Sequence, residues 1–278
     1  MLLCLDIGNT SISLGLFDRA AADASERRPT PLLTAKLSSD MGRTADEYAI
    51  ILRGLLCERT SEITEVAMGS VVPQLTHTLE AAVRKTVGRE PLPVLHIGGG
   101  VRTGISLRVD DPGALGADIV ANAAAAANLY GTPVVFFDYG TATVCGAVNA
   151  ARELVGVSIA PGLYTSLTAL RATAARLPYL ELQPPADRHT AGSVLGKNTA
   201  DAIRAGVVTG AALMTDGMLD SLRAELGLPA GTPLRAVVTG GLAELVLPAC
   251  WRDLVHEPHL TLIGLAIIYR ATVERKRK

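Results

Sequence analysis

A loop pattern that occurs twice, once in each half of the chain, limits most strongly what this sequence can fold into. An apolar run ends in an aspartate and turns through glycine into small polar residues, first as Asp6-Ile7-Gly8-Asn9-Thr10 and later as Asp138-Tyr139-Gly140-Thr141-Ala142-Thr143. Each apolar run is typical of a buried strand, and the backbone N–H groups of such a turn can face an anion. Two such loops can hold a nucleoside triphosphate and its metal, so the pattern predicts phosphoryl transfer.

The elements expected around the two loops also repeat in order. Each loop begins a run of three strands, and alternating helices and strands follow. The expected strands are 2–6, 12–17, 32–38, 66–72, 94–97, 105–109, 134–138, 143–149, 153–160 and 236–238. The expected helices are 44–59, 74–87, 115–130, 162–176, 198–226, one after Gly240-Gly241, and 260 to the chain end, with a polar loop at 19–31.

This repeated order is that of the duplicated ribonuclease-H-like architecture of the actin, hexokinase and Hsp70 superfamily. We therefore expect an α/β fold of two ribonuclease-H-like domains in tandem, an actin-like ATPase fold with a cleft between the domains. The boundary should lie near residue 131, which gives an N-terminal domain of residues 1–130 and a C-terminal domain of residues 131–278.

Composition excludes several other classes of protein. The 278 residues are 49% hydrophobic and carry a net charge of −1, which gives no reason to expect nucleic acid or an anionic membrane as a partner. No apolar run approaches the roughly 20 residues of a membrane-spanning helix, and the N-terminus lacks a signal-peptide pattern. The four cysteines have no Cys-x-x-Cys spacing and are expected to be buried thiols rather than disulfides or zinc ligands. We expect a cytoplasmic protein.

Some residues near the loops have two interpretations when they are taken alone. Asp118 lies in the first turn of the expected 115–130 helix, where a carboxylate stabilises the helix dipole but can also accept a proton from a substrate. By itself the dipole role is the more common one. Thr199 alone resembles a helix N-cap, and Gly240-Gly241 alone is an ordinary strand terminator.

Several stretches together resemble one family, the type III pantothenate kinases, over essentially the whole chain. The matching stretches are Asp6 to Thr10, Asp111-Pro112, Gly116-Ala117-Asp118, Asp138 to Thr143, Ala160-Pro161-Gly162, 174–178, Gly196-Lys197-Asn198-Thr199, Thr239 to Ala243 and Leu260 to Leu265. The resemblance implies ATP-dependent phosphorylation of pantothenate to 4′-phosphopantothenate, the first step of coenzyme A synthesis. It also implies a homodimer.

The resemblance assigns roles to individual residues. Asp118 would be the general base, Asp138 would bind a monovalent cation such as potassium or ammonium, and Asp6 would hold magnesium, often through water. The expected ATP and phosphate ligands are Asp6, Ile7, Gly8, Asn9, Thr10, Ser11, Ile12, Ser13, Gly140 and Thr141. The expected pantothenate contacts are Gly116, Ala117, Asp118, Ile119 and Thr199.

The chain departs from the family pattern at three places. The family's usual Gly-Ala-Asp-Arg ends here in Ile119, its Thr-Phe-Asp is replaced by Val144-Cys145-Gly146, and a frequent aromatic is replaced by Val109. Isoleucine has neither the charge nor the donors of arginine.

These departures keep other functions open. The chain could be a weak kinase, a kinase for a different small alcohol, or a silent nucleotide-binding or regulatory relative. The duplicated loops alone would also permit a sugar kinase or a polyphosphate-cleaving phosphatase. Three arginines could supply the missing charge: Arg102, Arg108 and Arg171.

Overall fold

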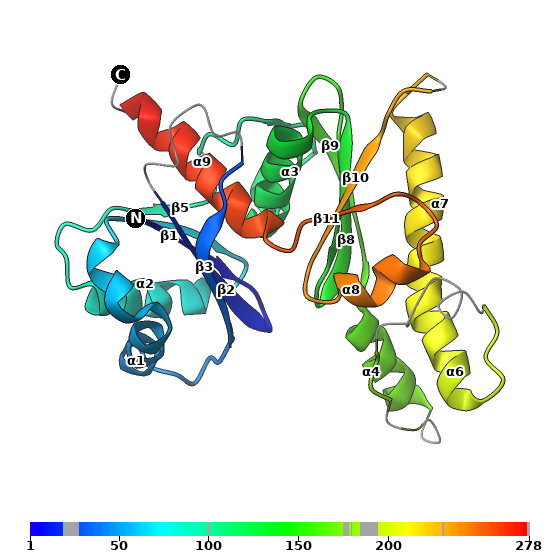
Figure 1. Cartoon of the computed structure of the whole chain (residues 1–278), viewed down its shortest axis with the longest axis horizontal. Coiled ribbons are helices and arrows are strands. Elements are labelled where there is room, and N and C mark those ends of the chain that lie inside the picture. The colour runs from blue at the N-terminus through cyan, green and yellow to red at the C-terminus, as the bar shows by residue number, and fades with distance from the viewer. Residues whose placement is uncertain are drawn as a thin grey trace. The chain divides into compact units, whose positions relative to one another are not determined.

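A computed structural model describes residues 1–18, 28–98, 101–174, 178, 180–183, 194–229 and 231–276. The chain forms two compact units, of which the first is Met1–Leu129 with His259–Lys278 and the second is Tyr130–Pro258 (Figure 1). Each unit contains a sheet, so the expected α/β class is confirmed. Most of the loop expected at 19–31 lies outside the described residues.

The first unit is built on a five-stranded sheet in the order β3-β2-β1-β4-β5. Its strands are β1 (Leu2–Ile7), β2 (Ser11–Phe17), β3 (Pro31–Ser38), β4 (Glu65–Ser70) and β5 (Val94–His96), and β6 (Ser106–Leu107) follows in the chain. Its helices are α1 (Ala45–Leu56), α2 (Pro73–Val87), α3 (Ala117–Tyr130) and α9 (Leu260–Lys276), with short 3-10 turns at Cys57–Glu62 and Pro112–Ala114.

The two faces of β1 lie against different helices. Leu3, Leu5 and Ile7 are fully buried in a core with α1 and α2, which lie on one side of the sheet (Figure 1). On the opposite face, α9 lies so close that Leu262 and Leu265 occupy the space beside Gly15 of β2 and Gly69 of β4. The face that carries Asp6 is therefore covered by α9.

The second unit repeats the first hairpin. Its strands, in the order β11-β10-β7-β8-β9, are β7 (Val134–Tyr139), β8 (Ala142–Val148), β9 (Glu153–Pro161), β10 (Arg235–Thr239) and β11 (Val255–His256). Its helices are α4 (Leu163–Thr173), α6 (Thr199–Arg204), α7 (Gly210–Glu225) and α8 (Ala243–Val246), with a 3-10 turn at Leu247–Ala249. Strand β7 has the same residue-by-residue burial pattern as β1, and β8 the same as β2.

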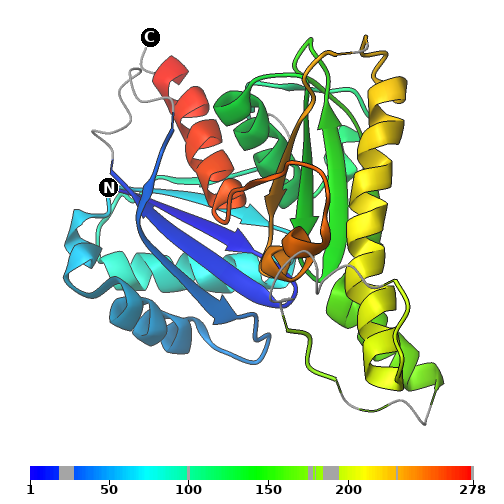
Figure 2. The same ribbon diagram turned by 45° about the vertical axis from the view of Figure 1, so that its right-hand side comes forward.

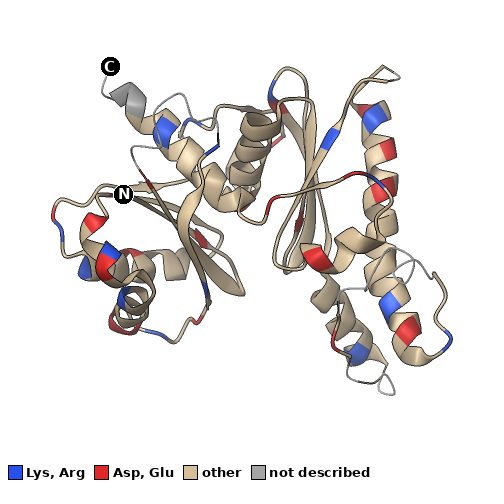
Figure 3. Cartoon of the chain, in the orientation of Figure 1, with Lys and Arg blue, Asp and Glu red and all other residues tan. Residues whose placement is uncertain are grey.

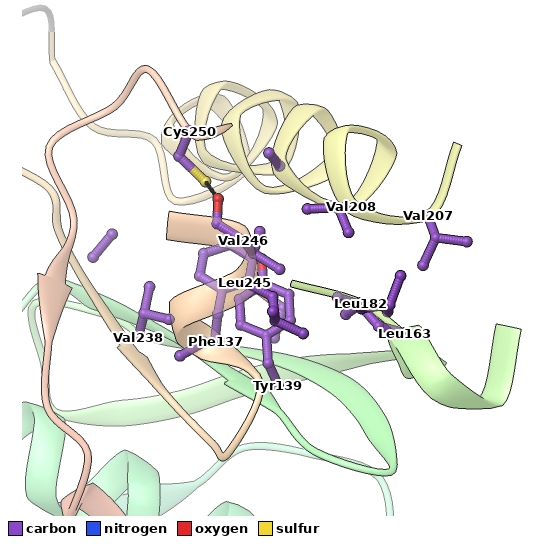
Figure 4. Packing of buried hydrophobic residues seen from close by; sticks show 14 of the residues in the cluster. Phe137, Tyr139, Leu163, Leu182, Val207, Val208, Val238, Leu245, Val246 and Cys250 are labelled. Atoms are coloured by element: carbon purple, nitrogen blue, oxygen red, sulfur yellow. Dashed lines mark hydrogen bonds between the residues drawn. The ribbon is translucent and has the colours of Figure 1, made fainter. Parts of the chain in front are cut away.

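The core of the second unit lies on one face of its sheet. Figure 4 shows Phe137 and Tyr139 of β7 beside Leu245 and Val246 of α8, with Val208 on the π-helical turn that leads into α7. Helix α7 runs alongside this sheet in both views (Figure 1, Figure 2). The side chains of Phe137 and Tyr139 point to this face, so Asp138 between them points to the other.

Two of the expected helices differ in their place or continuity. Helix α9 belongs to the first unit, although its position in the sequence assigns it to a domain of residues 131–278. Its residues 260–269 carry no charged side chain (Figure 3), and this apolar segment packs on the first sheet. The division between the units falls after Leu129, against the expected 131.

The second difference is a break in the helix expected at 198–226. A π-helical turn, Ala205–Thr209, separates α6 from α7. Three consecutive β-branched residues, Val207, Val208 and Thr209, follow Gly206 there, and both residue types favour the regular α-helix poorly. Among the described residues, no helix is long and apolar enough to cross a membrane.

Helices α3 and α9 approach each other closely at one point. A side chain on Gly264 of α9 would overlap the backbone of Ala121 in α3. The Thr261 hydroxyl donates to Oδ1 of the buried Asn122 at 2.8 Å on the same interface. Ala121 and its alanine neighbours in α3 are almost completely buried, and such small side chains allow a short distance between helix axes. This crossing fixes α3, and with it Asp118, in the first unit.

Replacing Gly264 with alanine should therefore destabilise the protein. The added methyl group has no space beside Ala121, and overpacking of this kind costs about 1–3 kcal/mol of unfolding free energy. Urea denaturation of Gly264→Ala and of the unaltered chain measures the difference.

Gly54→Ala is the matched control, because Gly54 lies in helix α1 of the same unit and a methyl group there meets nothing within 4 Å. Alanine in a helix is favoured over glycine by up to about 1 kcal/mol, so this variant should be at least as stable as the unaltered chain. Equal stability of the two glycine variants would contradict the close crossing.

Candidate active site

The first aspartate loop is a tight turn held by its own backbone. The Gly8 N–H donates to the Ser11 carbonyl at 3.1 Å, and a Cβ on Gly8 would lie only 3.0 Å from that oxygen. The Ser39 hydroxyl donates to the Gly8 carbonyl at 2.6 Å, and its N–H donates to the Thr10 carbonyl at 3.0 Å. The Gly8 N–H, expected to face a phosphate, is therefore used within the turn. Ser39 comes from a distant segment and has no local sequence signal.

Side chains of this loop divide between the two faces of the sheet. Asp6 pairs directly with Ser13 across β1 and β2, and both are partly exposed on one face. Ile7 and Ile12 are fully buried in the core on the other face. Among the expected ligands at residues 6–13, Ile7 and Ile12 could therefore offer only backbone groups.

The start of α3 lies at the same edge of the sheet as Asp6. Gly69 of β4 is the direct neighbour of Asp6 in the parallel ladder, and a Cβ on Gly69 would lie 3.4 Å from the Ala117 Cβ. Beyond β4, the Val71 N–H donates to the Ile7 carbonyl at 3.0 Å, and a Cβ on Gly116 would lie 3.2 Å from Val71 Cγ1. The structure thus brings the start of α3 to the carboxyl ends of β1 and β4, where Asp6 also lies.

Asp118 is a largely desolvated carboxyl in the first turn of α3. Its Oδ1 accepts the Ile119 N–H at 2.8 Å, and a side chain on Gly116 would overlap the same oxygen. A carboxylate that only stabilises the helix dipole would have a lowered pKa. Here burial raises the pKa of Asp118 despite the hydrogen bond from Ile119, because desolvation outweighs it. A raised carboxyl pKa is typical of catalytic acids and bases.

The second aspartate loop repeats the same construction with a turn one residue shorter. The Gly140 N–H donates to the Ala142 carbonyl at 3.0 Å, so this glycine too uses its N–H within the turn. The Thr141 carbonyl accepts from the Gly162 N–H at 3.1 Å and from the Thr165 hydroxyl at 2.6 Å. The start of α4 therefore holds Thr141 in place, and Thr165 is a contributor that the sequence did not indicate.

Gly240, in the turn after the neighbouring strand β10, lies directly against Asp138. Its φ of +95° favours glycine, and a Cβ there would lie 2.5 Å from Asp138 Oδ1 and from both Tyr139 backbone atoms N and O. The Leu242 N–H donates to the Tyr139 carbonyl at 3.1 Å. The turn after β10 is thus packed against the second aspartate loop, which an ordinary strand terminator would not require.

Thr199 is the first residue of α6 and is exposed. The N-cap is Asn198, whose Oδ1 accepts the Asp201 N–H at 2.9 Å, so the N-cap expected at Thr199 lies one residue earlier. Asp201 in turn accepts from Asn198 Nδ2 at 2.7 Å, which completes the cap. The Thr199 hydroxyl is therefore not the group that begins the helix.

The departures from the family pattern have a packing explanation at one position. Gly146 lies directly opposite Phe136 across β7 and β8, and the Phe136 ring occupies the space that a side chain at 146 would need. Val144 stands directly opposite Asp138 in the same ladder. Ile119 is 7% exposed, so its side chain is buried. The positive charge of the family's arginine is thus absent at Ile119, and the negative charge of its aspartate is absent at Gly146.

The arginines considered as replacements do not share one element. Arg102 and Arg108 are exposed in the first unit, and Arg171 is exposed on α4 of the second. Compensation for Ile119 by one of them stays a prediction.

A cavity of about 440 Å³ lies between β8, β9 and the C-terminal half of α7. Cys145 and Ala147 line it from the face of β8 opposite to Val144, so it is separate from the Asp138 loop. Burial raises the pKa of the Cys145 thiol to about 12, which keeps it protonated and unreactive.

Among the described residues, no group of three or more His, Cys, Asp or Glu side chains could hold a metal ion. Any cation at Asp6 or Asp138 would therefore have at most two such described side chains as ligands, and phosphate or water oxygens would supply most of the others. Magnesium that binds together with substrate phosphates commonly has one or two carboxylate ligands, so both residues fit such a cation.

Comparison with known sequences now decides between the families that share such loops. The family model for type III pantothenate kinase matches residues 2–221. The chain belongs to the type III pantothenate kinase family. A type III pantothenate kinase of Frankia alni is 38% identical over 98% of this chain and 100% of its own length, and one of Thermobifida fusca is 39% identical over 97% and 98%.

This membership confirms the resemblance drawn from the sequence motifs. The chain is a phosphotransferase, and the family's activity is the phosphorylation of pantothenate in coenzyme A biosynthesis. A sugar kinase or a polyphosphate-cleaving phosphatase, which the duplicated loops alone permitted, is not the family that matches.

Solved structures support the fold. A Campylobacter jejuni protein described as a Baf family transcriptional activator matches with a TM-score of 0.57 at 16% identity, over 99% of this chain and 100% of that one. The activator of 2-hydroxyisocaproyl-CoA dehydratase from Clostridium difficile, with bound ADPNP, matches with a TM-score of 0.52 at 12% identity, over 100% and 97%. At these identities the likeness shows the fold alone, which is the expected actin-like ATPase fold.

The raised pKa of Asp118 predicts a specific pH dependence of stability. A carboxyl whose pKa is raised by folding binds protons more tightly in the folded state, so its contribution is fully present below the ordinary carboxyl pKa. That stability is lost as pH rises through the raised value. At pH 7, Asp118→Asn should therefore be more stable than the unaltered chain, and this gain should shrink as pH falls through the raised pKa of Asp118 toward the ordinary carboxyl pKa.

Urea denaturation between about pH 4 and 8 measures this difference. Asp46→Asn is the control, because the Asp46 side chain is 75% exposed and pairs with Lys85 at the surface. Its substitution should not raise stability at pH 7. A wild-type chain that gains stability relative to Asp118→Asn as pH rises would show that burial does not dominate at Asp118.

Proposed function

We propose that this chain transfers the γ-phosphate of ATP to the primary hydroxyl of pantothenate with Asp118 as the general base. The observation that carries the assignment is the desolvated carboxylate of Asp118 at the start of α3, at the sheet edge where Asp6 also lies. Phosphorylation of an alcohol needs positioned phosphates and an acceptor for the hydroxyl proton. Burial makes Asp118 a better proton acceptor than an ordinary carboxylate.

The transfer is a single displacement at phosphorus. The pantothenate oxygen forms the new bond to the γ-phosphorus while the bond from that phosphorus to the bridging oxygen breaks, and ADP leaves with the bonding electrons. The hydroxyl proton passes to the Asp118 carboxylate. Desolvation of this carboxylate raises its pKa toward the working pH, where a base is most effective.

The first aspartate loop is proposed to hold the phosphates. Asp6, Ser11 and Ser13 lie on one face of the hairpin, so their oxygens can serve one group of ligands. Asn9 and Thr10, at the exposed tip of the turn, are proposed to contribute the remaining phosphate contacts, while Gly8 shapes the turn. Magnesium, held by Asp6 directly or through water, would neutralise charge on the phosphates when bound.

The second aspartate loop is proposed to serve the same ATP molecule. Thr141, held by Gly162 and Thr165, would contact the nucleotide, and Gly140 shapes the turn as Gly8 does. Asp138 is proposed to bind a monovalent cation, potassium or ammonium. A carboxylate at this position suits a singly charged cation that helps neutralise the phosphates.

The pantothenate contacts are proposed to come from the start of α3 and from α6. Ala117 and Ile119 are buried, so they would act through shape or backbone, while Gly116 leaves room for the Asp118 carboxylate. The exposed Thr199 is proposed to offer its hydroxyl to pantothenate, since Asn198 already caps α6.

A second candidate follows from the buried Ile119. Without the arginine of the family pattern, the chain could bind pantothenate weakly, accept another small alcohol, or bind nucleotide without transfer. The retained Asp6, Asp118 and Asp138 favour catalysis, because carboxylates beside an anion site would be poor choices in a protein that never binds a cation.

The decisive measurement is formation of 4′-phosphopantothenate from ATP and pantothenate by the purified chain. With magnesium and potassium, product should form, and replacing potassium with sodium should lower the rate. Asp118→Asn should lower kcat about 100- to 10,000-fold, which is the usual contribution of a general base. The rate of the unaltered chain should fall as pH drops through the raised pKa of Asp118.

Asp46→Asn, at an exposed site in the same unit, should keep the full rate. Product formation by Asp118→Asn at the wild-type rate would overturn the base assignment, and equal rates in sodium and potassium would overturn the cation at Asp138. A folded wild-type chain that binds ATP but forms no product would favour the silent relative. Product from another alcohol only would identify a different acceptor.

We also propose a cytoplasmic homodimer that binds neither nucleic acid nor membranes, as the family resemblance and the near-neutral charge suggest. Sedimentation equilibrium at micromolar concentration should give twice the chain mass of 29.0 kDa. A single species with the mass of one chain would contradict the dimer.

A further inference from the structure

We infer that a buried hydroxyl pair, Tyr139 with Thr215, positions the second aspartate loop and so sets how tightly the chain binds ATP and its monovalent cation. This inference rests on the proposed function of that loop. Neither residue is expected to touch a ligand, so both are positioning residues. The pair connects β7 of the sheet to α7, two elements that are distant in the sequence.

The backbone of Tyr139 lies at the junction of the two loops around Asp138. Its side chain points away from Asp138, because neighbouring residues of a strand alternate between faces. Its carbonyl accepts the Leu242 N–H at 3.1 Å, and Gly240 lies directly against its backbone atoms. A shift of Tyr139 would therefore move Asp138 on one side and the Gly240 turn on the other.

Among the described residues, the Tyr139 side chain makes one hydrogen bond, within a mostly apolar core. The ring is 1% exposed and lies among the residues of the core that Figure 4 shows. Its hydroxyl is hydrogen-bonded to Thr215 Oγ1. Thr215 Oγ1 donates its own hydrogen to the Ala211 carbonyl at 2.9 Å, so Tyr139 must be the donor of the pair. Burial raises the pKa of Tyr139, which keeps that donor protonated at any physiological pH.

The same turn of α7 also holds the segment that follows α8. Asp216, fully buried, accepts the Trp251 N–H and the Arg252 N–H at 3.1 Å each, one on each carboxylate oxygen. The Arg252 guanidinium binds both oxygens of Asp220 at 2.6 and 2.7 Å one turn further along. These hydrogen bonds hold the part of α7 that carries Thr215. Thr215 can therefore hold the Tyr139 hydroxyl in one position.

Packing alone would not need these hydroxyl groups. Phenylalanine and valine have nearly the same shapes as tyrosine and threonine, and a buried polar pair gives little net stability over apolar groups of the same shape. What the pair adds is direction, because a hydrogen bond fixes the ring along one line while apolar contact does not. The consequence is a fixed position for the residue that follows Asp138 in β7.

The test compares Tyr139→Phe and Thr215→Val with the unaltered chain, using the KM for ATP, the potassium concentration for half-activation, the KM for pantothenate and kcat. Loss of one buried hydrogen bond should raise both the KM for ATP and the potassium concentration for half-activation about three- to tenfold. The KM for pantothenate should stay within about twofold, because the residues proposed to bind pantothenate, apart from Thr199 on α6, lie in the other unit. Thr215→Ser keeps the acceptor oxygen that Thr215→Val removes, so it should bind ATP as tightly as the unaltered chain.

Thr86→Val is the matched control for a merely structural loss. Thr86 is buried in α2 of the first unit, and its hydroxyl donates to the Ala82 carbonyl at 2.8 Å. This variant, like Thr215→Val, loses the hydrogen bond of a buried threonine hydroxyl to its own helix, but it should keep the KM for ATP. Unchanged ATP and potassium constants in both Tyr139→Phe and Thr215→Val would overturn the inference, as would failure of Thr215→Ser to restore them.

Equilibrium binding of ATP in potassium, measured by calorimetry on the same variants, distinguishes failure of the proposed kinase function from failure of the positioning role of Tyr139 and Thr215. If the unaltered chain binds ATP but transfers no phosphate, the proposed function fails, and the binding constants of the variants still decide the role of the pair. If the unaltered chain transfers phosphate and the variants bind ATP equally well, only the inference about Tyr139 and Thr215 fails. If the unaltered chain does not bind ATP, both fail.

Discussion

The strand register of the two aspartate hairpins is the constraint on which the rest of the structure depends. In each hairpin one strand is buried except for a single aspartate near its end, and the pairing strand shows the same burial pattern in both copies. Because side chains alternate, a shift of one residue would move Asp6 or Asp138 into the apolar core and bring a large apolar residue to the surface. The apolar residues on either side therefore hold each carboxylate in place. The two turns differ by one residue without disturbing this register.

The sequence predicts the parts of the site that local pattern controls. Both aspartates, the glycines that turn the loops and the start of α3 follow from short motifs whose chemistry is local. Residues that arrive from distant segments have no such signal. Ser39 holds the first loop from 31 positions away and Thr165 holds the second from 24, and each is an ordinary hydroxyl residue in its own segment. The position of α9 was missed for the same reason, since only three-dimensional packing shows which sheet an apolar helix covers.

Motif matching also does not show which atoms of a residue are available to a ligand. Gly8 and Gly140 match positions that would bind phosphate, but each uses its N–H within the turn. Their contribution is to let the chain turn tightly enough for the neighbouring residues to face a ligand. Asp118 shows the opposite case. The sequence alone favours a helix-stabilising role, whereas burial reverses the direction of its pKa shift, and burial is a property of the folded unit.

The departure at Gly146 illustrates how neighbouring residues can prevent a lost side chain from being restored. The Phe136 ring occupies the space beside Gly146, so restoring the family's aspartate there would require the ring to move out of a fully buried position. Burying a new carboxylate against that ring would also be unfavourable without a partner. Reversal therefore needs at least two coordinated substitutions, a smaller residue at 136 together with the acid at 146. Ile119, also buried, is under the same kind of constraint, because an arginine at that position would have to bring its charge back to solvent or to an anion. Any compensation for these two lost charges must therefore come from other positions in the chain.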